Sequence, residues 1–364
     1  MAAGPSGDRP AGVKRAAPAA KAAKATKGTT AKSAKGAIAT KAAKGPTATK
    51  MKGVIAVPGA AAVPATVPAA EGTAAAARPR RARHPSLAIG IDVGGSGIKA
   101  AAVDLGTGAL ASPRHRIRTP EPSSPATVLP IIRHLLDTVR SDVGRDDLPV
   151  GVCFPSVILE GRTMTAANVD ADWIEYPALT ALSNAAGGPV GLINDADAAG
   201  LAEMRYGVGR GETGVVLLLT LGTGVGSGLF VDGRLVPNTE LGHMEIRGKD
   251  AEKRSASVQR VVRGIGWPEW AALLDEHLRA IDRILWPDLI ILGGGVSKNA
   301  HRFMGRLKVR PRLVPAHLRG DAGIVGAALW GAKTAKVRLP PVRVAIPTSV
   351  PEEPPEEQPE EPPE

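Results

Sequence analysis

The chain has 364 residues, enough for roughly one to three domains of ~100–200 residues each, and its net charge of +11 is unevenly distributed. Residues 1–84 carry +14, residues 85–349 carry +4 and residues 350–364 carry −7, so the nearly neutral centre gives no indication of nucleic-acid binding. The single cysteine, Cys153, excludes a disulfide framework and a multi-cysteine zinc site, and no apolar run approaches the ~20 residues that span a bilayer. We therefore expect a soluble, cytoplasmic protein without a membrane partner.

The two ends of the chain differ in composition from the rest. Residues 1–84 consist mostly of Ala, Lys, Gly, Thr and Pro, and such a segment buries too little surface to offset the entropy of ordering its backbone. A disordered basic arm is expected, and two interpretations stay open: it binds polyanions such as DNA, RNA or polyphosphate, or it is a dispensable solvated extension. Residues 336–364, rich in Pro and Glu, are expected to be a second disordered segment. Met51 is an alternative candidate for the first residue.

From Ser86 onward, apolar runs alternate with helical patterns, which predicts an α/β fold. The buried strand LAIGID leads into the glycine turn VGGSG and a second strand, and later GVVLLLTL leads into GTGVGSG and GLFVDG. An offset of 128 residues matches Asp92 with Thr220, Gly94 with Gly222, Val103 with Val231 and Asp104 with Asp232. This repetition predicts a duplicated module and two α/β lobes, at 85–205 and 206–335.

Further elements are predicted between and after the two modules. PATVLPIIRHLLDTVR has apolar residues at helical spacing, and helices are also expected after Asp195, over 270–285 and from Asp321. PVGVCF, PVGLIND and DLIILGGG are expected to be buried strands.

Three glycine-rich turns follow directly on buried strands: DVGGSGIK, LGTGVGSG and LGGGVS. Glycine lets the backbone approach a ligand closely, so that successive N–H groups can point at phosphate oxygens. A single turn of this kind is more often a tight β-hairpin, but three in one chain favour phosphate binding. A P-loop is excluded because GxxxxGK[ST] is missing, and Ser227 stands where a dinucleotide motif requires its third glycine. Lys99 is a candidate point charge and Asp92 a candidate magnesium partner.

Asp195 is the best candidate for a catalytic base. It lies in LINDAD at the carboxyl end of a strand and at the start of a helix, where open α/β sheets bind ligands. The alternative is an N-cap role, which Asp197 could fill equally well. A carboxylate that is hydrogen-bonded to a substrate hydroxyl can accept the hydroxyl proton as the hydroxyl oxygen attacks phosphorus. Glu240, His243 and Glu245 form a second polar group, for which hydroxyl recognition is favoured over a structural role.

Taken in order, six motifs resemble the ROK (repressor, open reading frame, kinase) sugar kinases, which have the two-lobed, RNase H-like fold of the actin-like ATPases. The motifs are GIDVGGSGIK, TAANVDADW, LINDADAAGLAE, LLLTLGTGVGSGLF, LVPNTELGHMEI and LIILGGGVSK, within residues 86–335. The resemblance is strongest to the branch that transfers phosphate from inorganic polyphosphate to glucose. It implies a sugar in the cleft between the lobes, Mg²⁺ as cofactor, ATP as a further donor and a homodimer.

The resemblance also implies roles for the residues at matching positions. Asp195 is implied as the general base toward the 6-hydroxyl of glucose, and Asp92 as the magnesium residue, directly or through water. The other sugar hydroxyls are implied to contact Asn168, Asn194, Glu240, His243 and Glu245. The phosphate donor is implied to contact Asp92, Gly94, Gly95, Ser96, Gly97, Lys99, Thr220, Gly222, Thr223, Gly224, Gly293, Gly294 and Gly295.

The chain departs from the usual family pattern. It lacks the CxCGxxGCxE motif, so no structural zinc is expected, and residues 1–84 hold no helix pair for the helix-turn-helix of the family's repressors. A set of bases predicts either a track for a long polyanion or a solvated face. Its members are Lys253, Arg254, Arg260, Arg263, Lys298, Arg302, Arg306, Lys308, Arg310 and Arg312. The alternatives to a polyphosphate-dependent glucokinase are a kinase that uses ATP only and a non-catalytic sugar-sensing or nucleic-acid-binding protein.

Overall fold

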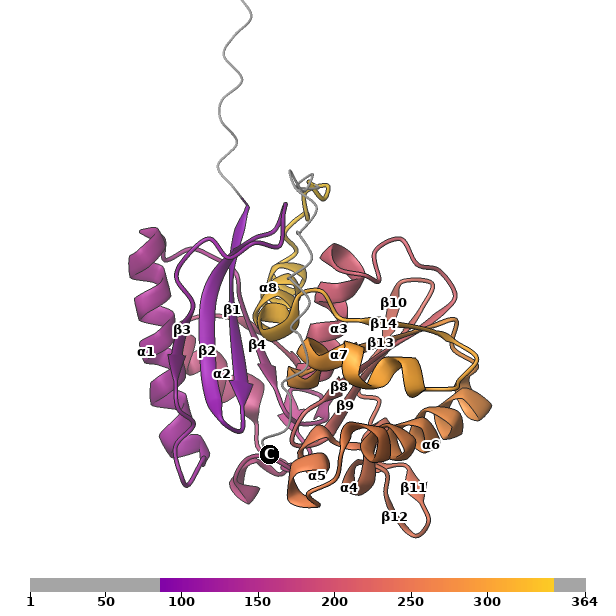
Figure 1. The fold of residues 1–364 in the computed structure, drawn as a ribbon. Helices are drawn as coiled ribbons and strands as arrows, with labels where there is room; N and C mark the ends of the chain where they lie inside the picture. Colours follow the sequence, from indigo (N-terminus) through magenta and orange to yellow (C-terminus); the bar gives the residue numbers. More distant parts are fainter. Residues whose placement is uncertain (1–85, 344–364) are drawn as a thin grey trace, which may run out of the picture. The chain divides into compact units, whose positions relative to one another are not determined.

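The computed structural model describes residues 86–343, which form two five-stranded sheets with helices packed on them (Figure 1). The basic arm expected at 1–84 and the part of the expected tail beyond residue 343 lie outside the described residues. Within 86–343, no helix is both long enough and apolar enough to cross a membrane.

The first sheet has the strand order β3-β2-β1-β4-β7. Its strands are β1 (Leu87–Gly94), β2 (Gly97–Asp104), β3 (His115–Ile117), β4 (Val150–Phe154) and β7 (Val190–Asn194). β1 and β2 are antiparallel, whereas β1, β4 and β7 are parallel. Because side chains alternate along a strand, Ile89 and Ile91 pack with α1 (Pro125–Val143) and α2 (Ala178–Ala186), while Ala88 faces the opposite way.

The second sheet repeats this arrangement in the order β10-β9-β8-β13-β14. Its strands are β8 (Val215–Leu221), β9 (Val225–Val231), β10 (Arg234–Val236), β13 (Leu289–Gly293) and β14 (Arg312–Pro315). Each strand pair has the same sense as its counterpart in the first sheet. The expected α/β class and the expected duplication are therefore confirmed. On the outer face of this sheet, Leu217 and Leu219 pack with α6 (Trp267–Leu285).

The two hairpins of the duplicated module differ in the length of their turns. Two residues separate β1 from β2, but three separate β8 from β9. Because turn length sets the register of a hairpin, β9 is displaced by one residue relative to β2. Val103 pairs with Ala88, whereas Phe230 pairs with Val216. The expected match of Val103 with Val231 is therefore wrong by one residue.

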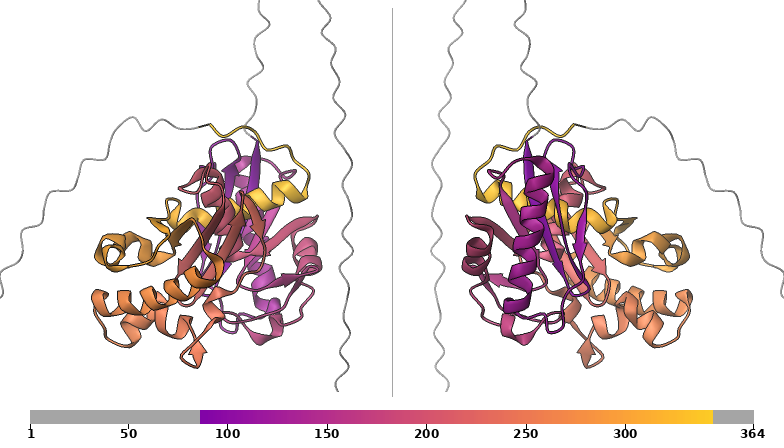
Figure 2. Two further views of the ribbon diagram at one scale, coloured as in Figure 1. Left: turned by 90° about the vertical axis from the view of Figure 1, so that its right-hand side faces the viewer. Right: turned by 90° about the vertical axis from the view of Figure 1, so that its left-hand side faces the viewer.

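Two helices lie between the sheets, α3 (Asp195–Tyr206) and α8 (Ala322–Thr334). They share one apolar core with both sheets, in which Ile324 of α8 contacts a cluster containing Ala88 of the first sheet and Leu218 of the second. Figure 2 shows α1 (purple) on the outer side of the first sheet and α8 (yellow) on the other side. Helix α8 therefore packs on the first sheet, although in sequence it belongs to the predicted second lobe, 206–335.

A row of glycines brings α8 close to the first sheet. Gly90, Gly151 and Gly191 are register partners on β1, β4 and β7. A Cβ atom on Gly90 would lie 1.9 Å from the carbonyl oxygen of Ile324, and one on Gly151 would lie 1.8 Å from that of Ala327. Side chains at these positions are therefore incompatible with the observed helix position.

Short elements connect the longer ones and supply several loops of the site described below. They are β5 (Ile158–Leu159), β6 (Arg162–Thr163), β11 (Glu245–Ile246), β12 (Lys249–Asp250), α4 (Glu252–Ser255), α5 (Ser257–Val262), α7 (Ala300–Phe303), η1 (Ala171–Trp173), η2 (Leu241–His243), η3 (Gly295–Asn299), η4 (Met304–Arg306) and η5 (Arg319–Asp321).

Candidate active site

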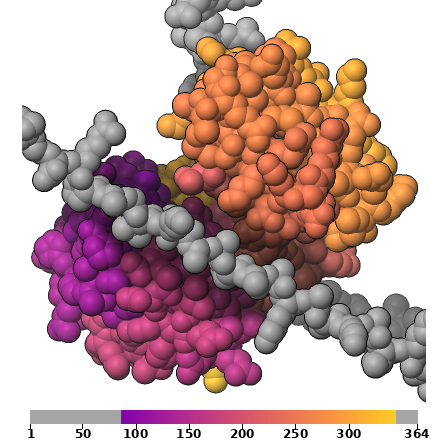
Figure 3. All heavy atoms as spheres, turned by 90° about the horizontal axis from the view of Figure 1, so that it is seen from below, coloured from indigo at the N-terminus to yellow at the C-terminus, as the bar shows by residue number. Residues whose placement is uncertain are grey.

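Two cavities of about 310 Å³ each adjoin at the ends of β1, β7, β8 and β13. The first, which we call the acidic cavity, holds Asp195, Glu240 and Glu252. The second, which we call the mixed-charge cavity, holds three cations and three carboxylates: Lys99, Lys298, Arg319, Asp92, Asp195 and Glu203. Asp195, Thr220 and Gly294 line both. Figure 3 shows the purple and orange parts of the chain side by side.

The structure brings most of the expected site residues to these cavities. The acidic cavity is lined by Gly94, Gly95, Ser96, Asn168, Asn194, Asp195, Thr220, Gly222, Thr223, Gly224, Glu240, His243 and Gly294. The mixed-charge cavity is lined by Asp92, Lys99, Asp195, Thr220, Gly293, Gly294 and Gly295. Two expected residues line neither cavity: Gly97 is buried at the start of β2, and Glu245 is exposed on β11.

Asp195 lies where β7 ends and α3 begins. The N-cap of α3 is Asn194, whose Oδ1 accepts hydrogen bonds from the N–H groups of Ala196 (2.8 Å) and Asp197 (3.1 Å). The Nδ2 of Asn194 donates to the carbonyl of Ser156 (3.1 Å), so both polar atoms of this side chain hold the local backbone. Because Asn194 supplies the cap, the Asp195 carboxylate is available to the cavities.

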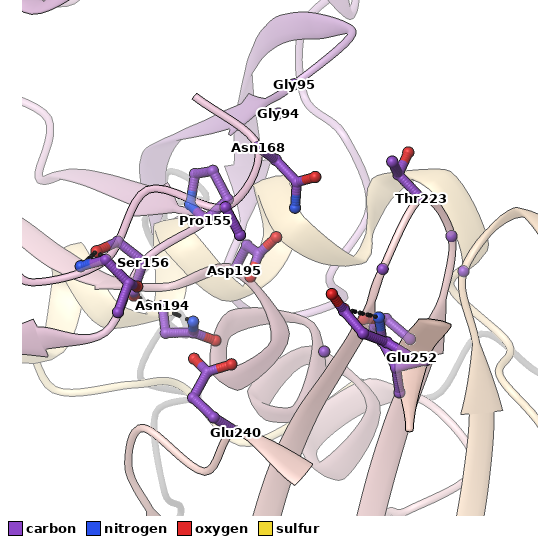
Figure 4. A pocket seen from close by; sticks show the side chains of 18 of the residues that line it. Gly94, Gly95, Pro155, Ser156, Asn168, Asn194, Asp195, Thr223, Glu240 and Glu252 are labelled. Atoms are coloured by element: carbon purple, nitrogen blue, oxygen red, sulfur yellow. Dashed lines mark hydrogen bonds between the residues drawn. The ribbon is translucent and has the colours of Figure 1, made fainter. Parts of the chain in front are cut away.

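The environment of Asp195 suits it to exchange protons near neutral pH. Its pKa is raised to about 7, mainly by burial and next by the negative charge of Asp92. The N–H of Ala196, which donates to Oδ1 at 2.8 Å, lowers this pKa in part. A base works best when its pKa lies near the working pH. Figure 4 shows the side chains of Asn168, Asp195 and Glu240 around the acidic cavity.

Glu240, His243 and Glu252 also line the acidic cavity. Burial raises the pKa of Glu240; the neighbouring His243 lowers it and Glu252 raises it. Glu252 accepts the N–H of Val225 at Oε2 (3.1 Å). His243, Asp250 and Glu252 place potential metal-ligand atoms within 4.8 Å of one another. The expectation that the chain holds no structural zinc stays a prediction, which metal analysis of the purified protein tests.

The carboxylate of Asp92 has three close neighbours, Lys99, Cys153 and Gly323. Its Oδ2 pairs with the Nζ of Lys99 (2.7 Å), and its Oδ1 accepts the thiol of Cys153 (3.6 Å). A Cβ atom on Gly323 would lie 2.8 Å from the Cγ of Asp92, so only a glycine fits at this position of α8 without a shift. The N-terminus of α8, the positive end of its dipole, therefore lies beside the carboxylate.

Several lining residues were not predicted from the sequence, among them Ser156, Thr165 and Arg319. Ser156 is buried, and its Oγ accepts the N–H groups of Met164 (3.1 Å) and Thr165 (3.0 Å). It lies just beyond the carboxyl end of β4, so the rule that ligands bind at strand ends could have found it. Arg319 carries no comparable signal, because it follows an irregular segment.

The bases expected as one polyanion track do not all face the same cavity. Lys298 lines the mixed-charge cavity, whereas Arg254, Lys308 and Arg310 line a separate groove beside α6. Two of these arginines pair with acids in that groove, Arg254 with Glu276 (2.7 Å) and Arg310 with Asp282 (2.9 Å). For them the interpretation as a solvated, ion-paired face is favoured.

Comparison with known proteins places these features in a family. The model of the ROK family matches residues 88–258. The polyphosphate glucokinase of Mycobacterium tuberculosis is 46% identical over 242 residues, which are 66% of this chain and 89% of that protein. The polyphosphate glucokinase of Mycobacterium leprae is 43% identical over 250 residues, 68% of this chain and 75% of that protein.

Solved structures agree with the sequence comparison. The inorganic polyphosphate/ATP-glucomannokinase of Arthrobacter sp. strain KM is 45% identical, with a TM-score of 0.66 over 68% of this chain and 99% of that one. A ROK glucokinase of Streptomyces griseus, 22% identical, shares the fold with a TM-score of 0.58 over 66% of this chain and 98% of that one. The resemblance inferred from the motifs, with its actin-like fold, is confirmed: the chain belongs to the ROK family of sugar kinases.

Proposed function

We propose that the chain transfers a phosphoryl group from inorganic polyphosphate, and also from ATP, to the 6-hydroxyl of glucose. The observation that carries the proposal is that Asp195 alone, among the ionisable residues of 86–343, lines both cavities. A base at that place can contact an acceptor hydroxyl in one cavity while the donor lies in the other. The activities named for the mycobacterial and Arthrobacter relatives support these substrates.

Glucose is proposed to bind in the acidic cavity, with Asn168, Glu240 and His243 at its other hydroxyls. Carboxylate, amide and imidazole groups can accept or donate the hydrogen bonds that sugar hydroxyls make. The side chain of Asn194 is occupied by the cap, and Glu245 lies outside both cavities, so we assign neither a direct contact with the sugar.

In the proposed transfer, Asp195 accepts the proton of the 6-hydroxyl as the hydroxyl oxygen attacks the terminal phosphorus. A new O–P bond forms, the bond to the bridging oxygen breaks, and its electron pair leaves with the shortened polyphosphate or ADP. Lys99, Lys298 and Arg319 are placed to stabilise that charge. The glycine turns of both hairpins offer backbone N–H groups toward the transferring phosphoryl group.

The mixed-charge cavity also suits Mg²⁺, the cofactor that the family resemblance implies. Asp92 and Asp195 both face it, and carboxylate and phosphate oxygens are the ligands that Mg²⁺ prefers. Because Lys99 already pairs with Oδ2 of Asp92, we propose that Asp92 holds the ion through water. When bound, the ion supplies partial neutralisation of the donor phosphates.

A coupled assay for glucose 6-phosphate with polyphosphate or ATP as donor tests this function. We expect turnover with both donors, and a loss of turnover in Asp195→Asn. Activity with ATP alone would identify a strictly ATP-dependent glucokinase, and no turnover with either donor would overturn the proposal. We further propose the homodimer implied by the family resemblance, which predicts a sedimenting species of twice the chain mass.

A further inference from the structure

Asp197 holds the segment that carries Glu240, which comprises residues 237–240 between β10 and η2. The Oδ2 of Asp197 accepts a hydrogen bond from the N–H of Asn238 (2.8 Å). Asp197 is 1% exposed, and its Oδ1 is buried without a hydrogen-bond partner within 86–343. A buried carboxylate with so few partners costs folding stability. This unfavourable burial indicates that Asp197 has a functional role, which it exerts by holding the segment 237–240.

Asn238 connects the same segment to the first half of the chain. Its Oδ1 accepts the N–H of Ile158, and its Nδ2 donates to the carbonyl of Ile158, both at 2.9 Å. Ile158 follows closely on Pro155 and Ser156, which line the acidic cavity. Asn238 has a φ of +59°, a conformation that asparagine tolerates better than most residues. One side chain thus joins two walls of the cavity.

A third anchor lies on the opposite side of the segment. The Oγ1 of Thr239 donates to the carbonyl of Ser227 on β9 (3.1 Å), and the Oγ of Ser227 accepts the N–H of Leu241 (3.0 Å). Glu240 therefore has a fixed neighbour on each side. Within the described residues its own carboxylate makes no hydrogen bond, so the held backbone sets its place in the cavity (Figure 4).

We propose that Asp197 and Asn238 are positioning residues that set where Glu240 meets the sugar and thereby determine the affinity for the hexose. This inference rests on the glucose phosphorylation proposed above. Neither residue lines the acidic cavity, so both act through the segment 237–240. Removing either anchor should weaken glucose binding and leave the donor in the mixed-charge cavity unaffected.

Four variants separate this role from a general structural one. Asn238→Gly is the sharpest, because glycine adopts a φ of +59° without strain and loses only the two bonds to Ile158. Asp197→Ala removes the acceptor for the Asn238 N–H, and Asp197→Asn keeps an acceptor oxygen. Asp232→Gly is the matched control: Asp232 also has a positive φ, of 50°, and accepts the N–H of Gly214 (2.9 Å), but it lies in the β9–β10 turn.

For each variant we would measure kcat, the KM for glucose, the KM for polyphosphate, the calorimetric Kd for glucose and the melting temperature. Asn238→Gly and Asp197→Ala should raise the KM and Kd for glucose about 10- to 100-fold, the effect of losing a hydrogen bond to a charged group or a buried pair of bonds. The KM for polyphosphate should stay within about twofold. Asp197→Asn should retain a glucose KM within about threefold, and Asp232→Gly should match the wild type.

In the double variant Asp197→Ala/Asn238→Gly, the fold-rise in the Kd for glucose should be smaller than the product of the two single rises, because both residues hold the same segment. A wild-type glucose Kd in folded Asn238→Gly would overturn the inference, as would equal rises in the KM for both substrates. A wild-type protein that fails to phosphorylate glucose would refute the proposed function instead. The two failures are thus distinguished by the wild-type assay.

Discussion

Lys99 lies directly opposite Asp92 in the β1–β2 pair, and its Nζ is 2.7 Å from the Oδ2 of Asp92 at the wall of the mixed-charge cavity. The two side chains are 27% and 14% exposed, so solvent screens the pair only in part. In the proposed transfer, the same cation serves both a fixed carboxylate and the incoming donor.

Replacing this cation should affect the donor rather than the sugar. We expect Lys99→Met to raise the KM for polyphosphate about 10- to 100-fold, because a charge-assisted contact to a phosphate is lost. The Kd for glucose should stay within about twofold. Steady-state kinetics and calorimetry measure the two effects. Lys333→Met on α8 removes a lysine that lines neither cavity and serves as the control; a comparable loss there would contradict the assignment.

Asp195→Asn should separate binding from chemistry. The amide cannot accept the hydroxyl proton, so kcat should fall by at least about 10²–10⁴-fold, the usual contribution of a positioned base. Glucose should still bind with a Kd within about threefold, because the side chain keeps its size and its bond to the N–H of Ala196. Calorimetry with glucose alone and the coupled assay give the two quantities. Full activity in this variant would exclude Asp195 as the base.

The pKa of Asp195, about 7, predicts that kcat/KM for glucose decreases at acidic pH. Only the ionised carboxylate can act as a base, so kcat/KM for glucose should fall about tenfold per pH unit below this value. Asp197, whose pKa burial also raises to about 7, is its close neighbour. A profile from pH 5 to 9 in the Asp197→Asn variant should retain this decrease, which excludes Asp197 as its source. A flat profile would contradict the prediction.

The same pKa predicts how stability changes with pH. Because the pKa of Asp195 is raised from 3.8 to about 7 on folding, the folded state binds more protons than the unfolded state between these values. The free energy of unfolding should therefore decrease as pH rises from about 4 to 7, by at most about 4 kcal/mol from this group. Asp195→Asn should be the more stable protein at pH 8 and show a shallower decrease in urea titrations. An equal pH dependence would refute the assignment.

The glycine row under α8 gives a prediction for stability alone. A methyl group on Gly151 would lie 1.8 Å from the carbonyl oxygen of Ala327, and backbone atoms cannot move aside cheaply. Gly151→Ala should lower the free energy of unfolding by about 3 kcal/mol or more, measured by urea denaturation. Gly188→Ala, where a Cβ atom would meet no atom within 4 Å, should stay within about 0.5 kcal/mol. Equal effects would argue against the close packing of α8.

The sequence predicts the strands and turns of the site well, because their signals are local. The apolar run before Asp92 and its repeat before Thr220 predict both hairpins, and the position of Asp195 after a buried strand predicts its place at the site. The one-residue difference in register was not predicted, because it depends on how each glycine turn closes. Glu245 is exposed because the β11–β12 hairpin carries it away from the cavity.

Contacts between distant segments could not be read from local patterns. The bond from Asn238 to Ile158 joins residues 80 positions apart, and the packing of Gly151 on Ala327 depends on the strand order of the first sheet. Asn194 was expected to bind a sugar hydroxyl, but which side chain caps a helix is decided by the backbone geometry at the end of the strand. These features require the fold, since sequence spacing alone leaves several partners open.

The return of α8 to the first sheet has a consequence for biosynthesis. Residues 86–194 emerge from the ribosome long before 322–334, yet the face of β1 and β2 that holds Ala88 and Val103 is covered by Ile324 and its neighbours. The nascent first half therefore exposes an apolar surface until residues 322–334 have emerged. Premature termination before residue 322 would leave that surface uncovered and favour aggregation.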